Sequence, residues 1–333
     1  MHKFSFASIK ILVTSYCNLC CKHCYQHFEK NKFQLPAKSI LEIIDFAHRN
    51  DTKIIDFGGG EFFTHPYAYD LLDYCFSKGI HVNIATNATS VSREYFASLR
   101  HLDLVSIQIS VDGLKENHES RRGSGTYHQM INNAKFLYEL GLPLTASMAL
   151  DEKNYTDAID VLQMPYFSNV IFLPVALTGA AKNNASSNAA KTAEYEKTMC
   201  FVMEGTECGD GDFQNNVFPS VLTIKYNGNV YPAPVASDYD LLRMGNVYEQ
   251  PIEIIAENFL ESESYHKLRS IRNSEIVECN TCASSDRCNR GCRFRAMKFH
   301  GEMLRPDPFY CRIFENTYYD IPLGKLFWGE KST

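Results

Sequence analysis

The sequence contains no apolar run long enough to cross a bilayer, since the longest, such as Val170–Leu177, fall far short of the ~20 residues that a membrane helix needs. The first ten residues lack the charged head, long apolar core and small-residue cleavage site of a secretory signal. There is no long basic run, and the net charge is -6. We therefore predict a cytoplasmic protein that binds neither nucleic acid nor a membrane.

Cysteine is plentiful, with 12 in the 333 residues, and cytoplasmic cysteines bind metals more often than they form disulfides. Cys17, Cys21 and Cys24 follow the apolar stretch Ile9–Val13 in a C-x3-C-x2-C pattern. This spacing suits a [4Fe–4S] cluster whose fourth iron has no protein ligand, and an open iron indicates chemistry rather than electron transfer alone. The alternatives are a partial zinc site or a chance spacing.

Short apolar runs alternate with segments of helical period from residue 9 to about residue 180, which predicts an α/β fold with a parallel sheet. We place its six strands at Ile9–Val13, Lys53–Phe57, His81–Thr86, Leu104–Val111, Leu144–Ala149 and Val170–Leu173. Six strands make an incomplete barrel, whose functional groups belong in the loops after the carboxyl ends of the strands. One expected helix buries the face formed by Ile40, Ile43, Ile44 and Ala47.

The second half of the chain has a different composition. Ala180–Ala190 is small, polar and aperiodic, which is typical of a connection. Leu222–Tyr231 has the pattern of a hairpin, with Asn227 and Gly228 as the two left-handed residues of its turn. The loop-rich segment Cys279–Cys311 has so few apolar residues that we expect metal to hold its shape. The predicted organisation is a barrel at 1–183, a connection at 184–216 and a cysteine-rich domain at 217–333.

The pattern of Cys17, Cys21 and Cys24 resembles that of the radical S-adenosylmethionine (radical SAM) superfamily, and these cysteines then form its catalytic cluster site. The resemblance implies a partial (β/α)6 TIM-like barrel and an open iron that chelates the amino and carboxylate groups of S-adenosylmethionine. One electron then breaks a carbon–sulfur bond and gives a 5′-deoxyadenosyl radical. Using Cys20 as the middle ligand would depart from the family, so we expect Cys20 to be a packing residue. Cys75, on an expected helix, is interpreted as a core residue.

The segment Gly58-Gly59-Gly60-Glu61 at the end of the second strand resembles the Gly-Gly-Glu motif of the family. The resemblance implies that Gly59, Gly60 and Glu61 receive the amino group of the cofactor. We expect glycine here because a Cβ atom would hold the ligand away from the backbone. The family usually has proline after the acid, whereas this chain has Phe62. A tight turn without a ligand is the alternative.

Further expected cofactor contacts follow the later strands. Thr86 and Asn87 resemble the Thr-Asn-Gly turn of the family, with Ala88 in place of glycine. In relatives, groups at the positions of Ser110 and Arg122 contact the ribose or the carboxylate of the cofactor, although strand termination and helix capping are alternative roles. His23 either stacks on the adenine or is a solvated loop residue.

Near the C-terminus, Cys279-x2-Cys282-x5-Cys288-x3-Cys292 followed by Cys311 resembles the SPASM extension, which houses auxiliary [4Fe–4S] clusters. The resemblance implies that four of these thiols close one cluster, which then serves electron transfer or structure. The implied ligands are Cys279, Cys282, Cys288 and Cys311, while Cys292 reaches to a second cluster. A four-cysteine zinc site is the alternative.

The second auxiliary cluster lacks one expected ligand. The family has cysteine after the proline that follows the hairpin, and here Pro232 is followed by Ala233. Either Cys200, Cys208 and Cys292 hold a cluster with three thiolates, or the site is empty, or Ala233 replaces a cysteine by engineering.

The resemblance implies an enzyme that abstracts a hydrogen atom from a peptide or protein, because SPASM relatives crosslink or epimerise ribosomal peptides or oxidise a sulfatase residue to formylglycine. The first thirty residues contain no winged leader-binding domain, which favours an epimerase or the sulfatase-maturing type. The implied reductant is an external flavodoxin or ferredoxin. The alternatives are a radical enzyme of cofactor or antibiotic biosynthesis that acts on a small molecule, and a non-catalytic metal-binding scaffold.

Overall fold

The computed structural model describes residues 6–24, 32–151, 153–174, 221–234, 242–271, 273–285, 290, 293–307 and 311. The chain divides into two compact units, one of Met1–Asn188 with Gln214–Ser270 and one of Ala189–Phe213 with Ile271–Thr333. Within the described ranges, no helix combines the length and the apolar character that crossing a bilayer demands.

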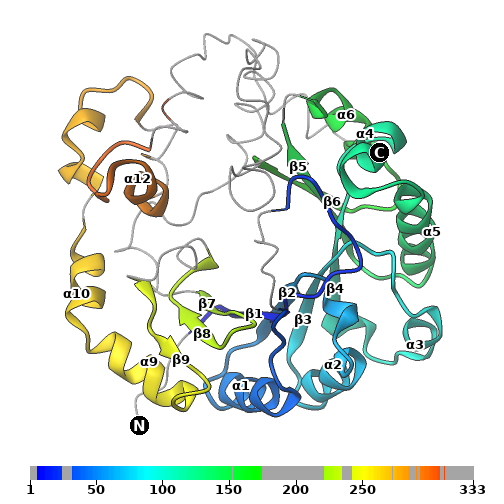
Figure 1. Ribbon diagram of the computed structural model, residues 1–333, viewed down its shortest axis with the longest axis horizontal. Helices are drawn as coiled ribbons and strands as arrows, with labels where there is room; N and C mark the ends of the chain where they lie inside the picture. Colours follow the sequence, from blue (N-terminus) through cyan, green and yellow to red (C-terminus); the bar gives the residue numbers. More distant parts are fainter. Residues whose placement is uncertain are drawn as a thin grey trace, which may run out of the picture. The chain divides into compact units, whose positions relative to one another are not determined.

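The first unit contains six parallel strands that lie side by side in chain order (Figure 1). They are β1 (Ser8–Thr14), β2 (Ile54–Gly59), β3 (His81–Thr86), β4 (Val105–Ser110), β5 (Leu144–Leu150) and β6 (Asn169–Pro174). All six predicted strands are confirmed, and the α/β class with a parallel sheet is correct. Because the strands run parallel, their carboxyl ends, and the loops that follow them, lie along one edge of the sheet.

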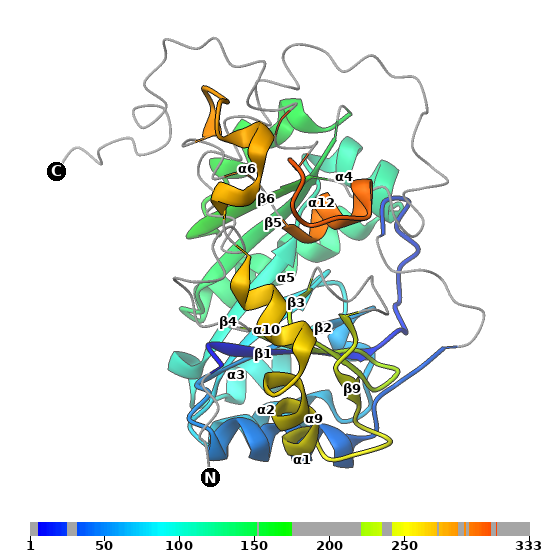
Figure 2. The same cartoon turned by 90° about the vertical axis from the view of Figure 1, so that its left-hand side faces the viewer.

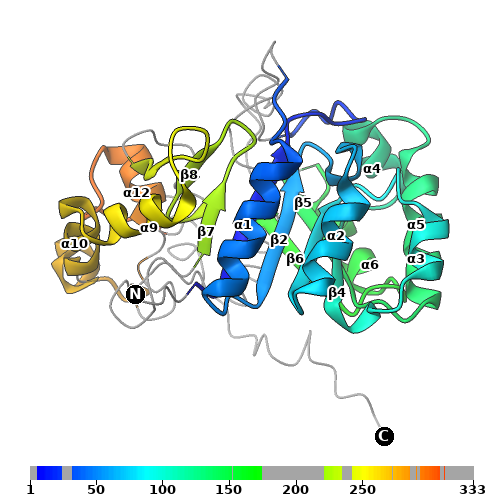
Figure 3. The same cartoon turned by 90° about the horizontal axis from the view of Figure 1, so that it is seen from below.

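Helices follow the strands and cover one face of the sheet, and Figure 3 shows α1 and α2 in front of β1 and β2. The α-helices of this part are α1 (Ala37–Arg49), α2 (Ala68–Ser77), α3 (Arg93–Ser98), α4 (Lys115–Arg122), α5 (Thr126–Glu139) and α6 (Ala158–Leu162). Short 3-10 helices lie at η1 (Phe62–Thr64), η2 (Leu102–Leu104) and η3 (Tyr155–Asp157). The expected apolar face of α1 is buried, and so is Cys75 on α2, as predicted.

The two faces of the sheet differ in polarity. On the face toward the helices, residues such as Ile9, Ile11 and Ile84 are fully buried. On the opposite face, the carboxylate of Asp56 accepts hydrogen bonds from Ser8 at 2.6 Å and from Asn83 at 2.7 Å. A closed barrel fills its interior with branched apolar side chains, whereas this polar face remains partly exposed.

A later segment extends the same sheet beyond β1. β7 (Val221–Ile224) pairs in parallel with β1, and β8 (Asn229–Tyr231) and β9 (Gly245–Asn246) continue in antiparallel order. α9 (Ile252–Leu260) lies beside α1, joined by an ion pair between Arg49 and Glu253, and α10 (Glu263–Ser270) follows (Figure 2). The predicted domain boundary at residue 217 stays a prediction. In the structure, residues 221–270 belong to the same compact unit as the six parallel strands.

The predicted hairpin is confirmed, but its predicted turn type is wrong. Of the two turn residues, Gly228 has a positive φ, of 83°, and Asn227 does not. The N–H of Gly228 donates to the carbonyl of Lys225 at 2.8 Å, and the N–H of Lys225 donates to the carbonyl of Asn229 at 2.9 Å. The connection is therefore a three-residue loop with one left-handed glycine, which is the next most common hairpin type.

The described part of the second unit consists of loops and short helices, including η6 (Asn273–Glu275), η7 (Val277–Cys279) and α12 (Arg293–His300). The side chain of Arg293 is fully buried and donates to the carbonyl oxygens of Met303 and Arg305, both at 2.8 Å. An ion pair of 2.9 Å joins Arg305 to Glu278. Polar contacts with the main chain thus support this segment, in keeping with its low apolar content.

Candidate functional site

The three N-terminal thiols lie on the loop that leaves the carboxyl end of β1. The N–H of Cys24 donates to the carbonyl of Cys21 at 3.2 Å, so the second half of the motif closes a turn. Cys21 is buried, whereas Cys17 and Cys24 are half-buried. Cys20 is exposed, so its expected role as a packing residue is wrong. The adjacent thiol, Cys21, is the buried one.

The glycine segment holds the start of this cysteine loop. The N–H of Gly60 donates to the carbonyl of Thr14 at 2.7 Å. A Cβ atom at Gly59 would lie 2.4 Å from the oxygen of Thr14, and one at Gly60 would lie 2.1 Å from the oxygen of Tyr16. The protein's own backbone therefore already excludes a side chain at both glycines, and the expected approach of a ligand to them stays a prediction.

Glu61 is a buried acid that joins two loops. Its Oε1 accepts from the hydroxyl of Thr86 at 2.7 Å and from the N–H of Phe63 at 3.3 Å, and its Oε2 accepts from the N–H of Asn87 at 2.8 Å. Burial raises the pKa of Glu61, although these hydrogen bonds and the charge of Arg122 oppose the rise. Among the described residues Oε2 has one donor, which leaves room for a second donor such as an ammonium group.

Phe62, which stands where the family has proline, anchors the same loop. Its ring is fully buried and stacks on Phe57 with centroids 4.8 Å apart. Phe63 beside it stacks on Tyr69 at 5.5 Å. These aromatic contacts fix the path of the chain after Glu61 without the rigid ring of a proline.

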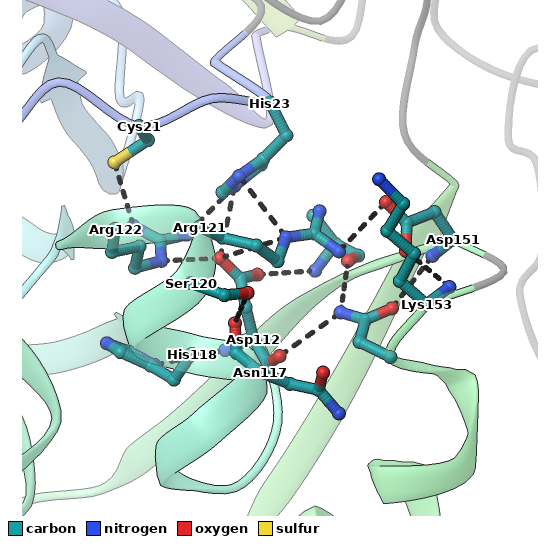
Figure 4. Close-up of polar contacts among 12 residues, drawn as sticks. Cys21, His23, Asp112, Asn117, His118, Ser120, Arg121, Arg122, Asp151 and Lys153 are labelled. Carbon is teal, nitrogen blue, oxygen red and sulfur yellow. Dashed lines mark hydrogen bonds and ion pairs between the residues drawn. The ribbon is translucent and has the colours of Figure 1, made fainter. Parts of the chain in front are cut away.

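Arg122 and Asp112 form a buried ion pair beside the cysteine loop (Figure 4). The Nε of Arg122 lies 2.5 Å from Oδ2 of Asp112, and its Nη1 lies 3.9 Å from Sγ of Cys21. Burial alone would raise the pKa of Asp112, but the charge of Arg122 and those of its neighbours hold it well below its usual range. Asp112 is thus ionised, and it keeps the guanidinium of Arg122 next to the thiols.

His23 belongs to this cluster rather than to the solvent (Figure 4). Its Nε2 lies 3.1 Å from Oδ2 of Asp112, and its Nδ1 accepts from Nε of Arg121 at 3.4 Å. Burial lowers the pKa of His23 to about 4, against the opposing charge of Asp112. The ring is therefore neutral, with its proton on Nε2 facing the carboxylate. His23 as an adenine platform stays a prediction.

Arg121 ties the cysteine loop to α4. Its carbonyl accepts from the N–H of Lys22 at 3.0 Å, and its Nη1 pairs with Asp151 at 3.1 Å. Arg121 and Asp112 were not among the predicted site residues. Asp112 had a usable signal, since it follows the carboxyl end of β4 at the edge of the sheet where the other site residues lie.

The remaining predicted residues are distributed as follows. Thr86 and Asn87 lie at the end of β3 in contact with Glu61, and Ser110 is half-exposed at the end of β4. In the second unit, Cys279 is buried while Cys282 and Cys311 are half-buried. The N–H of Cys282 donates to the carbonyl of Cys279 at 3.3 Å. The other predicted ligands, Cys200, Cys208, Cys288 and Cys292, lie outside the described residues.

Burial and the charge of Arg122 act in opposite directions on the N-terminal thiols. Burial raises the pKa of Cys21 to about 11, although the charge of Arg122 opposes the rise, and burial also raises the pKa of Cys17. Cluster binding must therefore release these protons, which makes it dependent on pH. Among the described residues no three ligand-type side chains stand close enough to share one metal ion, whereas the thiols of a [4Fe–4S] cluster each bind a different iron and lie farther apart.

Comparison with known proteins connects this geometry to a family. Residues 11–164 match the Radical SAM superfamily, and residues 218–283 match the SPASM iron–sulfur cluster-binding domain. The AdoMet-dependent heme synthase of Methanosarcina barkeri is 23% identical over 90% of this chain and 94% of its own length. The mycofactocin maturase MftC of Mycobacterium tuberculosis is 25% identical over 89% of this chain and 80% of its own.

Among solved structures, Streptococcus suis SuiB bound to its precursor peptide SuiA superposes with a TM-score of 0.71. The match covers 92% of this chain and 76% of SuiB at 16% identity, so it supports the fold alone. The first match includes all three N-terminal thiols, and the second, which ends at residue 283, includes Cys279 and Cys282 of the C-terminal motif. The chain therefore carries a Radical SAM domain at residues 11–164 and a SPASM iron–sulfur cluster-binding domain at residues 218–283.

Proposed function

We propose that this protein is a peptide-modifying radical SAM enzyme, which reductively cleaves S-adenosylmethionine and abstracts a hydrogen atom from a peptide or protein. One observation carries the proposal: three thiols, a buried acid and a buried cation lie together along the carboxyl edge of a parallel sheet. Cys17, Cys21 and Cys24 supply the thiols, Glu61 the acid and Arg122 the cation. A metal scaffold has no need of an acid and a cation beside an open iron.

Within this proposal each residue has a defined task. Cys17, Cys21 and Cys24 hold a [4Fe–4S] cluster, which supplies one electron to the sulfonium of S-adenosylmethionine. Glu61, with Gly59 and Gly60, receives the amino group of the cofactor, because its Oε2 has room for another donor. The cationic Arg122 attracts an anionic group of the cofactor.

Further contacts are proposed on the sequence resemblance. Thr86, Asn87 and Ser110 border the cofactor at the ends of β3 and β4, and His23 borders it from the cysteine loop. One or two auxiliary [4Fe–4S] clusters use the thiols of the C-terminal segment. The proposed electron donor is an external flavodoxin or ferredoxin, and the proposed location is the cytoplasm, without nucleic acid or a membrane as a partner.

Proteins of the same fold that act on peptides favour a peptide substrate. SuiB was solved with a precursor peptide, and its fold matches over most of this chain. The face of the sheet opposite the helices is polar, which suits a peptide, because a peptide backbone needs hydrogen-bonding partners. Epimerisation, crosslinking and side-chain oxidation all begin with the same hydrogen abstraction.

A small porphyrin is the second candidate substrate, because the heme synthase of Methanosarcina barkeri matches along 90% of this chain. A porphyrin requires a large apolar binding surface. The face of this sheet opposite the helices carries the polar residues Ser8, Asp56 and Asn83 instead. Measuring which of the two substrates the enzyme converts distinguishes the peptide from the porphyrin.

The test uses anaerobically reconstituted protein, S-adenosylmethionine and dithionite. Short peptides encoded by genes adjacent to this one are compared with iron coproporphyrin III as substrates, in D2O and in H2O. We expect 5′-deoxyadenosine to form faster with a peptide, together with a mass change in the peptide or uptake of solvent deuterium. Conversion of the porphyrin alone would favour the second candidate.

A further inference from the structure

Asn87 is a buried side chain whose orientation the surrounding hydrogen bonds determine. Its Oδ1 accepts from the main-chain N–H of Thr89 at 2.9 Å and from the Thr89 hydroxyl at 2.6 Å. A main-chain N–H can only donate, so the opposite orientation of the amide would place two donors face to face. The Nδ2 of Asn87 must therefore point the other way, toward the cysteine loop.

Two acceptors stand on that side. Nδ2 of Asn87 lies 2.9 Å from Oδ1 of Asn18 and 4.0 Å from Sγ of Cys17. Asn18 is itself oriented, since its Nδ2 donates to Oγ1 of Thr89 at 2.7 Å and to Oγ of Ser90 at 2.9 Å. Each amide thus fixes the direction of the other, and one Asn87 N–H remains for the sulfur.

The sulfur of Cys17 consequently has two donors nearby, because the N–H of Leu19 also lies 3.4 Å from it. The same residue, Asn87, donates its main-chain N–H to Glu61. Asn87 therefore contacts the acid through its backbone and the thiol through its side chain.

We propose that Asn87, oriented by Asn18, is a positioning residue that donates a hydrogen bond to the Cys17 ligand and raises the reduction potential of the N-terminal cluster. The proposal rests on the proposed function, since it requires a cluster at Cys17. Reduction adds negative charge to the cluster, and a donor at a ligating sulfur stabilises the reduced form more than the oxidised form. A neutral amide achieves this without adding a full charge.

The experiment measures the midpoint potential of the cluster by EPR-monitored redox titration of the full, reconstituted protein. The N-terminal cluster is identified as the signal that changes when S-adenosylmethionine is added. Asn87→Leu removes the donor without adding charge. The matched control is Asn133→Leu, because Asn133 braces the same loop through the carbonyl of Ala88 at 2.8 Å and has no contact with Cys17 among the described residues.

We expect Asn87→Leu to shift the midpoint potential to a more negative value and Asn133→Leu to leave it unchanged. An unchanged potential in Asn87→Leu would overturn the proposal. Equal shifts in both variants would also overturn it, because they would report distortion of the loop. Failure of the proposed function has a separate sign, namely that no signal of the unaltered protein responds to S-adenosylmethionine.

A second measurement does not require the Asn87→Leu variant to retain its cluster. The unaltered protein is prepared with asparagine labelled with 15N in the side-chain amide, and pulsed EPR is recorded on the reduced cluster. A hyperfine coupling to the labelled nitrogen is expected. Its absence would overturn the proposal even if the variant could not be assembled.

Discussion

The main-chain N–H of Glu61 donates to the carbonyl oxygen of Tyr16 over 2.8 Å, so the residue before the first cluster thiol is bonded to the proposed cofactor acid. Close approach of the two strands at this point depends on Gly60, where a Cβ atom would lie 2.1 Å from the oxygen of Tyr16. The cysteine loop and the glycine segment therefore form one structural unit.

Gly60→Ala should displace the cysteine loop and reduce iron uptake at the N-terminal site, with a loss of about 1–3 kcal/mol in unfolding free energy from overpacking. The matched control is Gly58→Ala, whose Cβ would make ordinary contacts of 3.5 Å and 3.9 Å. Iron content and urea denaturation measure both effects. Equal iron content in the two variants would contradict the role given to Gly60.

Ala88 has a φ of 57°, a left-handed conformation that is unfavourable for alanine, and it stands in place of the glycine of the Thr-Asn-Gly turn that the sequence resembles. Ala88→Gly relieves this strain but adds freedom to the unfolded chain and removes a buried methyl group, so we expect a change within about 1 kcal/mol. Ala85→Gly, within β3, has no strain to relieve and should destabilise by roughly 1 kcal/mol or more. Urea denaturation of both variants checks the difference, and an equal loss would argue against strain at Ala88.

His118 provides a pH-dependent contribution to stability. Burial lowers the pKa of His118 to about 4, and its Nδ1 accepts from the N–H of Asp112. The unfolded chain takes up a proton near pH 6.5 and the folded chain only near pH 4, so stability falls as the pH falls through this window. Across the whole window the unfolding free energy falls by an amount on the order of 3 kcal/mol.

His118→Asn retains an acceptor for the N–H of Asp112 but has no titrating ring. Unfolding free energies of the variant, measured by urea denaturation between pH 7 and pH 4, should therefore depend less on pH than those of the unaltered protein. Parallel pH profiles would show that His118 is not the group responsible.

Ala233 is buried and follows Pro232, where the resemblance to the SPASM extension implies a cysteine ligand. Ala233→Cys should raise the iron content of reconstituted protein by up to about four atoms per chain, the content of one cluster. Ala256→Cys is the control, because Ala256 is also buried but lies within α9, which contains none of the predicted ligand positions. An unchanged iron content in Ala233→Cys would indicate that the other thiols cannot complete a second auxiliary site.

Much of the fold could be predicted from the sequence because the relevant signals are local. The strand His81–Thr86 was predicted with its observed bounds, since an apolar run between turn residues defines it. The motif cysteines and Glu61 were recognised by spacing and order along the chain. The pairing of β7 with β1 was not predicted, because contacts between remote segments leave no local pattern.

The missed features of the site have the same cause. The exposure of Cys20 depends on how the loop turns, and the backbone contact that excludes a side chain at Gly60 comes from the loop after β1. Arg121 resembles any charged helical residue until its contact with Lys22 is seen. Long-range hydrogen bonds thus decided what the motifs alone could not.

The most direct test of the radical SAM assignment is formation of 5′-deoxyadenosine from S-adenosylmethionine and dithionite by anaerobically reconstituted protein. We expect the unaltered protein to form it, and a variant with Cys17, Cys21 and Cys24 changed together to Ala to form none while retaining about four irons at the C-terminal thiols. Cleavage of the cofactor by that variant, or none by fully loaded unaltered protein with or without substrate, would contradict an open iron at these three thiols.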